Sequence, residues 1–402
     1  MMTDRIDNLK TIACRAIDDH SLQLKEIGDK IWENPELGLK EYYAHDLLTK
    51  FFSEHGFDDV EKSFVTDTAF RVTASNPDPK AHVAVLCEYD ALPEIGHACG
   101  HNLIAEAGAS AALGILAAIK AGLRGKLTVF GTPAEESDGG KLFLIDKGAF
   151  KDVDAAMMVH PAAINSFKTD YLSIKSFCIT YRKSAHHELK DIWEKLNPLD
   201  AAIIAYNSIS ALRSKMRPTW RIHGIIADGG VSPCVLPEKS VLKYYLRTPT
   251  EAEMISLEED VRKCFDSAAI ATNCTVEIEL DEGHYKSIQH NDAMIDTFSA
   301  NAKKFGIISD PYDNCKPSGS TDMGNVSHEV PSIHPKYALA TNANIHTREF
   351  AEAAASDKSQ IVTIQMAKTL AMTAIDLIED SSLMKRAKDE FNERKTGQVE
   401  TK

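Results

Sequence analysis

The chain has 402 residues, of which 44% are hydrophobic and 26% are charged. This is the balance of a soluble globular protein of about two domains, which can bury a core without disulfides or metals. Because the formal net charge is −14 and no Lys/Arg-rich patch stands out, we expect neither nucleic acid nor an anionic membrane surface as a partner. The eight cysteines are scattered, the start of the chain is polar, and no run approaches the ~20 apolar residues of a membrane span, so we expect a cytoplasmic protein.

The first 160 residues carry the pattern of an α/β domain. Apolar residues at helical spacing predict helices over residues 17–34 and 41–52. Three short apolar runs predict strands, at residues 81–87, 126–130 and 154–159. An Ala-, Gly- and Leu-rich stretch at residues 102–119 predicts a buried helix between the first two strands. This order predicts an α/β fold with a mixed, mostly parallel sheet flanked by helices.

The pattern after residue 170 predicts an inserted domain. Strands are predicted at 171–181, 221–226, 240–246 and 274–280, and helices at 199–212 and 250–269. The second of these helices opens with Thr250 and Glu253, a typical N-terminal capping pair. The β-α-β-β-α-β order is that of a ferredoxin-like α+β unit. Because helical periodicity resumes at 291–305 and 349–377, we expect a discontinuous catalytic domain, 1–170 with 285–402, interrupted by a domain at 171–284. We expect the charged tail from Lys385 to fray.

Side chains that bind metals follow successive predicted strands. They are Cys99 and His101 after the first strand, Glu135 and Glu136 after the second, and His160 at the end of the third. Because the carboxyl ends of parallel strands share one edge of a sheet, these side chains can converge there. Thiolate, imidazole and carboxylate are zinc ligands, and a hydrolytic site needs one glutamate as a ligand and another as a base. His346 is a further candidate.

Each of these signals also has a plainer interpretation. The segment EIGHACGHN at 94–102 is also compatible with a turn that holds a buried cysteine and a hydrogen-bonded histidine. The glutamate pair is also compatible with a solvated acidic loop, and a lone histidine with a core or surface residue. A different chemistry would make Cys99 a nucleophile with His101 as its base, but the two-residue spacing and the nearby carboxylates favour a metal.

At these residues the sequence resembles the M20 metallopeptidase family, most of all its amidohydrolase subgroup of aminoacylases and dipeptidases. Matching stretches run in order through nearly the whole chain: NPELG (34–38), CEYDALP (87–93), GHACGHN (96–102), TPAEE (132–136), MMVHP (157–161), residues 221–236, SGSTDMGNVS (318–327) and residues 332–335. The resemblance implies that the inserted domain is a lid and dimerisation domain, so that a homodimer is expected. It also implies two divalent metals, zinc or alternatively manganese or cobalt. The implied reaction is hydrolysis of the amide bond of dipeptides or N-acyl amino acids by metal-activated water, with dipeptides ending in a basic residue as one preference.

The resemblance also assigns roles to single residues. The matched metal ligands are Cys99, His101, Glu136, His160 and His346, with Cys99 bridging. Glu135 matches the general base, and Asp90 matches the aspartate that orients a ligand. In the wider family a histidine two residues before that aspartate is itself a ligand, and here that place holds Glu88. In the lid, His186 matches a catalytic histidine, with His187 as the competing choice. Arg247 matches the arginine that binds the substrate carboxylate, and Cys234 and Thr321 match substrate-contacting positions.

Two lid residues depart from the family pattern. Cys234 stands where the family usually has Asn, and Arg182 stands where the histidine motif usually begins with Gly. An amide that donates and accepts hydrogen bonds is thereby replaced by a weakly polar thiol. These departures keep open an alternative, an M20-fold metal-binding protein with altered or lost peptidase activity that acts on an unusual substrate or partner.

Overall fold

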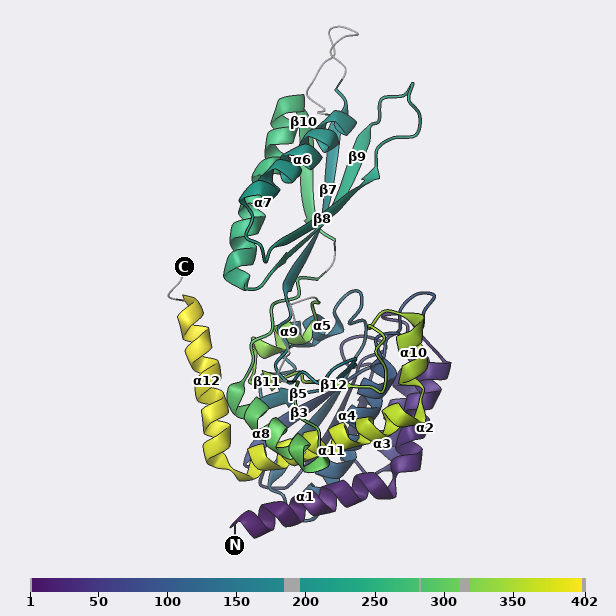
Figure 1. The fold of residues 1–402 in the computed structure, drawn as a ribbon, viewed down its shortest axis with the longest axis vertical. Coiled ribbons are helices and arrows are strands. Elements are labelled where there is room, and N and C mark those ends of the chain that lie inside the picture. Colours follow the sequence, from purple (N-terminus) through teal and green to yellow (C-terminus); the bar gives the residue numbers. More distant parts are fainter. Residues whose placement is uncertain (1, 184–195, 282, 311–318, 400–402) are drawn as a thin grey trace. The chain divides into compact units, whose positions relative to one another are not determined.

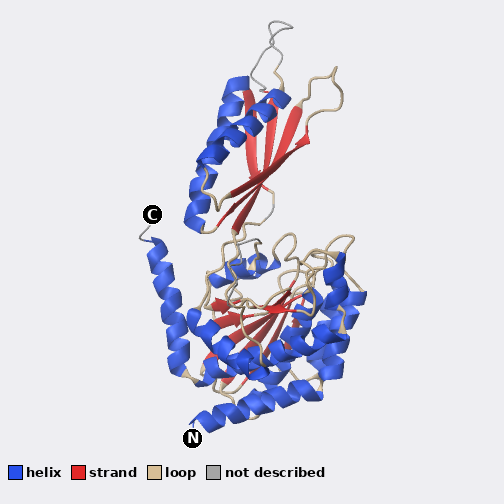
Figure 2. Ribbon diagram, viewed as in Figure 1, coloured by secondary structure: helices blue, strands red, loops and turns tan. Residues whose placement is uncertain are grey.

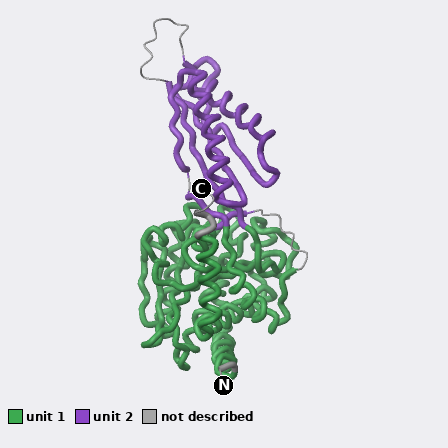
Figure 3. The backbone as a smooth tube through the Cα atoms, turned by 90° about the vertical axis from the view of Figure 1, so that its left-hand side faces the viewer, with its two compact units in different colours: residues 1–170, 288–316, 322–402 green, residues 171–287, 317–321 purple. Residues whose placement is uncertain are grey.

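The computed structural model describes residues 2–183, 196–281, 283–310 and 319–399. The chain forms two compact units (Figure 3). Unit 1 comprises Met1–Asp170, Ile288–Lys316 and Asp322–Lys402, and unit 2 comprises Tyr171–Ser287 and Pro317–Thr321. The predicted domain boundaries differ from these units at residues 285–287 and 319–321. These residues lie in unit 2 because Tyr285 pairs with Ile174 and the carbonyl of Gly319 accepts a hydrogen bond from the amide of Leu172.

The sheet of unit 1 has six strands in the order β1-β2-β4-β3-β5-β11. They are β1 (Asp59–Lys62), β2 (Phe70–Ser75), β3 (Ala81–Glu88), β4 (Gly125–Thr132), β5 (Ala155–Met157) and β11 (Ser332–Ile333). The pairs β3–β4, β3–β5 and β5–β11 are parallel, whereas β1–β2 and β2–β4 are antiparallel. Strands buried on both faces read as continuous apolar runs, which explains why β3 and β4 were found from the sequence. The predicted α/β class with a mixed, mostly parallel sheet is confirmed.

Helices surround this sheet (Figures 1 and 2). They are α1 (Met2–Asp19), α2 (Ser21–Glu33), α3 (Tyr42–Glu54), α4 (His101–Lys120), α5 (Gly140–Asp146), α8 (Asp292–Ala302), α9 (Met323–Ser327), α10 (Arg348–Ala354), α11 (Asp357–Glu379) and α12 (Ser381–Val399). The almost fully buried α4 packs between β3 and an outer layer of α1, α2 and α11. The expectation that the tail frays from Lys385 is wrong. The helix α12 packs against α8 and buries Leu383, Met384 and Ala387.

Two helices correct the expectation that no stretch of this chain is long and apolar enough to cross a membrane. By length and composition alone, α4 and α11 reach that limit among the described residues. Within the protein, 94% and 72% of their apolar segments are buried. The core packing of unit 1 accounts for such composition, because helices buried on all sides are apolar all round.

Unit 2 is an antiparallel sheet with two helices on one face (Figure 1). Its elements are β7 (Ser173–Lys183), α6 (Pro198–Leu212), β8 (Arg221–Asp228), β9 (Lys239–Thr248), α7 (Glu251–Thr272) and β10 (Cys274–Leu280). The strand order β10-β7-β9-β8 is the ferredoxin-like arrangement that the sequence predicts. Phe177, Leu242 and Tyr244 are buried in the core beneath α6 and α7. The Thr250 side chain accepts a hydrogen bond from the amide of Glu253, which confirms the predicted cap of α7.

Candidate metal centre

The candidate ligand residues of unit 1 lie just beyond the carboxyl ends of its parallel strands. Cys99 and His101 flank the start of α4, which follows β3. Glu135 and Glu136 occupy the turn between β4 and α5. His160 begins β6 (His160–Ala162), a strand after β5 that pairs in parallel with β12 (Lys336–Ala338). His346 precedes α10.

The structure brings these six residues into three overlapping groups. In each group the possible ligand atoms all lie within 4.8 Å of one another. The groups are Cys99, His101 and His160; Cys99, Glu136 and His346; and His101, Glu135 and Glu136. Cys99 Sγ lies 3.4 Å from His160 Nε2, and Glu136 Oε1 lies 3.2 Å from His346 Nε2. Because Cys99, His101 and Glu136 each belong to two groups, the donor set has room for more than one ion.

The unsatisfied nitrogen of His101 shows that this set fits a cation. His101 Nδ1 lies 3.0 Å from Asp90 Oδ1, an interaction that fixes the ring. The other nitrogen, Nε2, is buried without a hydrogen-bond partner in the described chain. Oxygens of Glu88, Glu136 and Glu135 lie 3.6, 3.9 and 4.0 Å from it. These distances are too long for hydrogen bonds but close to the ~3.4 Å that separates neighbouring ligands of one tetrahedral ion.

The balance of charge at the site points the same way. The ionisable groups of the site include four buried carboxyl groups, of Glu88, Asp90, Glu135 and Asp322, the partly buried carboxyl group of Glu136, and one buried ammonium, of Lys141. Buried carboxylates without compensating charge are costly, and divalent cations supply that charge. The residues present therefore fit divalent metal ions.

Backbone conformation lets distant segments meet at the site. Gly100, between Cys99 and His101, has a φ of 78°, and a Cβ there would lie 2.5 Å from Pro161 Cγ. Glycine at this position lets the α4 turn approach the segment that carries His160. His346 has a φ of 67°, and its amide donates to the carbonyl of Ala98 at 2.8 Å. That bond holds the His346 loop against the same turn.

The adjacent glutamates have opposite electrostatic environments. Burial and the neighbouring Glu136 raise the pKa of Glu135 well above its ordinary value. Burial also acts on Glu136, but the hydrogen bond from His346 and the charge of His101 outweigh it and lower the pKa of Glu136. A pair of carboxyl groups whose pKa values are driven apart is typical of divided acid–base roles. Glu136 is suited to be an anionic ligand, and Glu135 to accept and return a proton.

Burial acts in opposite senses on two other donors. Burial and the charge of His101 hold the pKa of His160 well below its ordinary value, so that its imidazole is neutral, the form that binds metals. Burial and Glu136 raise the pKa of the Cys99 thiol well above its usual range. A buried thiol of this kind becomes a thiolate when a metal binds.

A model of peptidase family M20/M25/M40 matches residues 84–362. The chain belongs to this family. It is 43% identical over 399 residues to an Xaa-Arg dipeptidase of Mus musculus, with 96% of this chain and 93% of that protein covered. It is 41% identical over 403 residues to an Xaa-Arg dipeptidase of Homo sapiens, with 96% and 92% covered.

Solved structures of M20-like proteins share the fold. A Bacillus subtilis protein described as a dinuclear metal binding peptidase from family M20 superposes with a TM-score of 0.67 at 17% identity, covering 90% of this chain and 99% of that chain. An aminobenzoyl-glutamate utilization protein from Klebsiella pneumoniae superposes with a TM-score of 0.68 at 16% identity, covering 90% and 98%.

The substrate-binding residues expected of an M20 peptidase lie in unit 2. The partly buried Arg247 donates from Nη1 to Ser320 Oγ at 3.0 Å. Thr321 is 2% exposed, whereas Cys234 is exposed in the loop between β8 and β9. Arg182 is exposed on β7, where it pairs with Lys239 and Thr275. His186 and His187 lie outside the described residues.

Sequence reasoning missed two features beside the candidate metal centre. The ring of His334 is buried with its centroid 5.5 Å from that of His160. A signal for it was present, because the His-Pro pair at 160–161 recurs at 334–335. Lys141 is fully buried, and its ammonium donates to Glu88 and, at 2.6 Å, to Asp322. Lys141 lies in none of the matched stretches, although Glu88 and Asp322 do.

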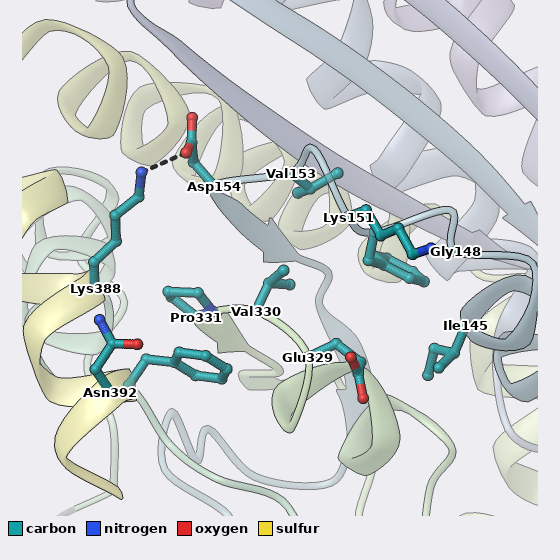
Figure 4. Close-up of a pocket in the computed structure, with 12 residues that line it drawn as sticks. Ile145, Gly148, Lys151, Val153, Asp154, Glu329, Val330, Pro331, Lys388 and Asn392 are labelled. Carbon is teal, nitrogen blue, oxygen red and sulfur yellow. Dashed lines mark hydrogen bonds and ion pairs between the residues drawn. The ribbon is translucent and has the colours of Figure 1, made fainter. Parts of the chain in front are cut away.

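A hollow elsewhere in unit 1 is separate from the M20 site (Figure 4). Its volume is about 290 Å³, and Val153, Val330, Pro331, Lys388 and Asn392 contribute to its wall. Val153 and Asp154 precede β5, and Val330 and Pro331 precede β11. The hollow therefore lies at the amino ends of strands whose carboxyl ends face the candidate ligands.

Proposed function

We propose that this chain is a metal-dependent dipeptidase, with N-acyl amino acids as further substrates. The observation that carries the proposal is the placement of Glu135, with its raised pKa, beside the anionic Glu136 in a cluster of metal-ligand residues. The identities of 43% and 41% to Xaa-Arg dipeptidases support dipeptides that end in arginine as the preferred class.

The metal ligands in this proposal are Cys99, His101, Glu136, His160 and His346. Bound divalent cations would act as Lewis acids toward the amide carbonyl and lower the pKa of a water molecule. We propose zinc, because a set of thiolate, imidazole and carboxylate donors suits it, with manganese or cobalt as substitutes.

The protein groups divide the remaining work. Glu135 takes the proton of the attacking water and returns it to the leaving amine, a task suited to a carboxyl group whose pKa is raised above its ordinary value. Asp90 holds His101 through Nδ1 and accepts the amide hydrogen of Glu136 at 2.9 Å. One carboxylate thus orients a ligand ring and the glutamate turn together.

Arg247 is proposed to bind the free carboxylate of the dipeptide. Burial lowers the pKa of its guanidinium. Because the ordinary pKa of arginine is far above neutrality, the group stays charged. The hydrogen bond to Ser320 engages Nη1, which fixes the orientation of the group while other N–H donors remain for a carboxylate.

We also propose a homodimer formed through unit 2. The strand β8 is an edge of the described sheet, and Ile225 and Ile226 on it are 60% and 40% exposed. On α6, Ile203 and Tyr206 are 43% and 38% exposed. Natural proteins rarely leave an apolar edge strand uncovered, and a second copy would cover it.

The seven described cysteines are all free, which supports a reducing, cytoplasmic setting.

The test is a hydrolysis screen of Xaa-Arg, Xaa-Lys and Xaa-Glu dipeptides and N-acyl amino acids, with zinc, manganese and cobalt supplied in turn. Glu135→Gln should abolish turnover while metal stoichiometry is kept. Asp138→Asn, a change at an exposed acid in the same turn, should leave turnover intact and serves as the control. Metal binding without hydrolysis of any of these amides would refute the proposal and favour the alternative of a metal-binding protein with lost activity.

A further inference from the structure

Glu41 is a buried carboxylate to which the proposed chemistry assigns no role. Its side chain is 0% exposed, although it sits at the N-terminal boundary of α3. It does not cap that helix, because Glu36 accepts the hydrogen bonds of the Tyr43 and Ala44 amides at 2.9 and 3.1 Å. A buried carboxyl group needs hydrogen-bond partners. Since Glu36 bonds the amides at the start of α3, the side chain of Glu41 is left to bond another segment.

That segment is the turn that carries the two glutamates. Glu41 Oε1 accepts the backbone amide of Ala134 at 2.8 Å, and Oε2 accepts the hydroxyl of Thr68 at 2.8 Å. Ala134 immediately precedes Glu135 and has a φ of 58°, in the left-handed region that is strained for a residue other than glycine. Its carbonyl accepts the amide of Gly139 at 2.8 Å. Both peptide groups around this strained residue are therefore held.

The turn is held on its other side as well. The amide of Glu136 donates to Asp90 Oδ2 at 2.9 Å. The backbone amides directly before and directly after Glu135 are thus each bonded to a buried carboxylate, from Glu41 and Asp90. Gly38 lets the Glu41 segment come this close, since a Cβ there would lie 2.9 Å from the Cβ of Ala134.

We infer that Glu41 is a positioning residue, which fixes the left-handed turn at Ala134 and thereby aims the Glu135 carboxylate. The inference rests on the proposed function, in which Glu135 moves the proton. A general base misplaced by about 1 Å can lose about 100-fold in rate. The hydrogen bonds of the Glu41 side chain go to Ala134 and Thr68, neither of which is a candidate ligand. Its loss should therefore lower kcat and leave metal binding and KM unchanged.

Three substitutions at position 41 separate position from charge. Glu41→Gln keeps an oxygen acceptor for the Ala134 amide, and its NH₂ can donate to Thr68 Oγ1 once that hydroxyl rotates, so kcat should stay within about 3-fold of wild type. Glu41→Asp keeps the charge but is one methylene too short, so kcat should fall about 10-fold. Glu41→Leu removes the acceptor, and kcat should fall about 10- to 100-fold.

Thr68→Val is the matched control, because it removes the second partner of Glu41 and leaves the bond to Ala134. Its kcat should remain near that of wild type. Metal content and metal dissociation constants are measured for every variant, and Glu41→Asp and Glu41→Gln decide the question even if Glu41→Leu does not fold.

Wild-type kcat in Glu41→Asp, low kcat in Glu41→Gln, or metal binding that falls together with kcat would overturn the inference. Glu135→Gln, run in the same assay, separates the two ideas. If it is inactive while Glu41→Leu and Glu41→Asp are fully active, only the role of Glu41 is wrong. If it remains active, the proposed function fails.

Discussion

Replacing Lys141 by methionine tests whether the buried ion cluster next to the metal centre is held by its single cation. Lys141, Glu88 and Asp322 are all 0% exposed, and the ammonium donates to both carboxylates. Methionine has a similar length and fills the space without a charge. The substitution leaves two buried carboxylates with no counter-ion from Lys141.

The expected loss of unfolding free energy follows from what those carboxylates can do. Breaking a buried ion pair by removal of one partner costs about 3–5 kcal/mol. The alternative for the protein is to protonate a carboxyl group. For Glu88, with an ordinary pKa of 4.5, this costs about 4 kcal/mol at pH 7.5 and about 1 kcal/mol at pH 5.5. Both routes predict a loss of about 4 kcal/mol at pH 7.5.

The sign of the pH dependence is fixed by the same reasoning. Burial raises the pKa of Glu88 and of Asp322 even with Lys141 present. Without Lys141 their folded pKa values rise further, so the variant approaches wild-type stability only at low pH and loses stability as pH rises through those values. The destabilisation should therefore be at most half as large at pH 5.5 as at pH 7.5.

Urea unfolding of the metal-free proteins at the two pH values measures this difference. Lys385→Met is the matched control, because its side chain is 76% exposed and its ion pair with Asp389 spans one helical turn. That variant should lose about 0.5 kcal/mol or less at either pH. A loss below about 1 kcal/mol for Lys141→Met at pH 7.5, or an equal loss at both pH values, would refute the reasoning.

Three further predictions concern Glu41, Arg247 and the bound metal. Burial and the charge of Asp90 raise the pKa of Glu41 to about 7. The contribution of Glu41 to stability is therefore complete below pH 4.5 and is lost as pH rises through 7. In urea titrations, the unfolding free energy of metal-free Glu41→Gln relative to wild type should rise by about 3 kcal/mol between pH 4.5 and 8. Arg247→Lys should raise KM for dipeptides about 10-fold or more with a smaller change in kcat, because the planar fork is lost; equal KM values would contradict the assigned role. A chelator should abolish hydrolysis and added zinc, manganese or cobalt should restore it, whereas a hydrolase with Cys99 as nucleophile would survive the chelator.

Local sequence patterns predicted most of the helices and strands of the fold. The strands β3 and β4 and the helix α4 were predictable because each is a short or continuous apolar segment with turn residues at its ends. The ferredoxin-like unit was predictable because its strands and helices alternate in a regular order. The observed bounds of these elements extend only a few residues beyond the apolar segments that predicted them. The strands β1, β2, β6, β11 and β12 were not predicted. Three of them, β6, β11 and β12, have only two or three residues each, too few to show a period.

Contacts between distant segments were invisible to the same reasoning. Glu41 reaches Ala134 across 93 residues, and Lys141 reaches Asp322 across 181. Neither pair has a spacing or a periodicity that marks it in the sequence. The motifs contain most of the candidate ligands, Glu135 and the supporting Asp90, whereas Glu41 and Lys141 lie singly outside any motif. Sequence reasoning therefore finds the groups that carry the chemistry more readily than the groups that hold them in place.

The departures from the family pattern and the complete part of the site fall in different units. Every candidate ligand, the proposed base Glu135 and both carboxyl groups that hold its turn belong to unit 1. Cys234 and Arg182 belong to unit 2, where both are exposed. In the proposed function, metal binding and proton transfer use residues of unit 1, whereas the expected substrate contacts lie in unit 2. We therefore expect Cys234, which stands where the family usually has Asn, to affect the choice of substrate, whereas the candidate ligands and the proposed base are all present in unit 1.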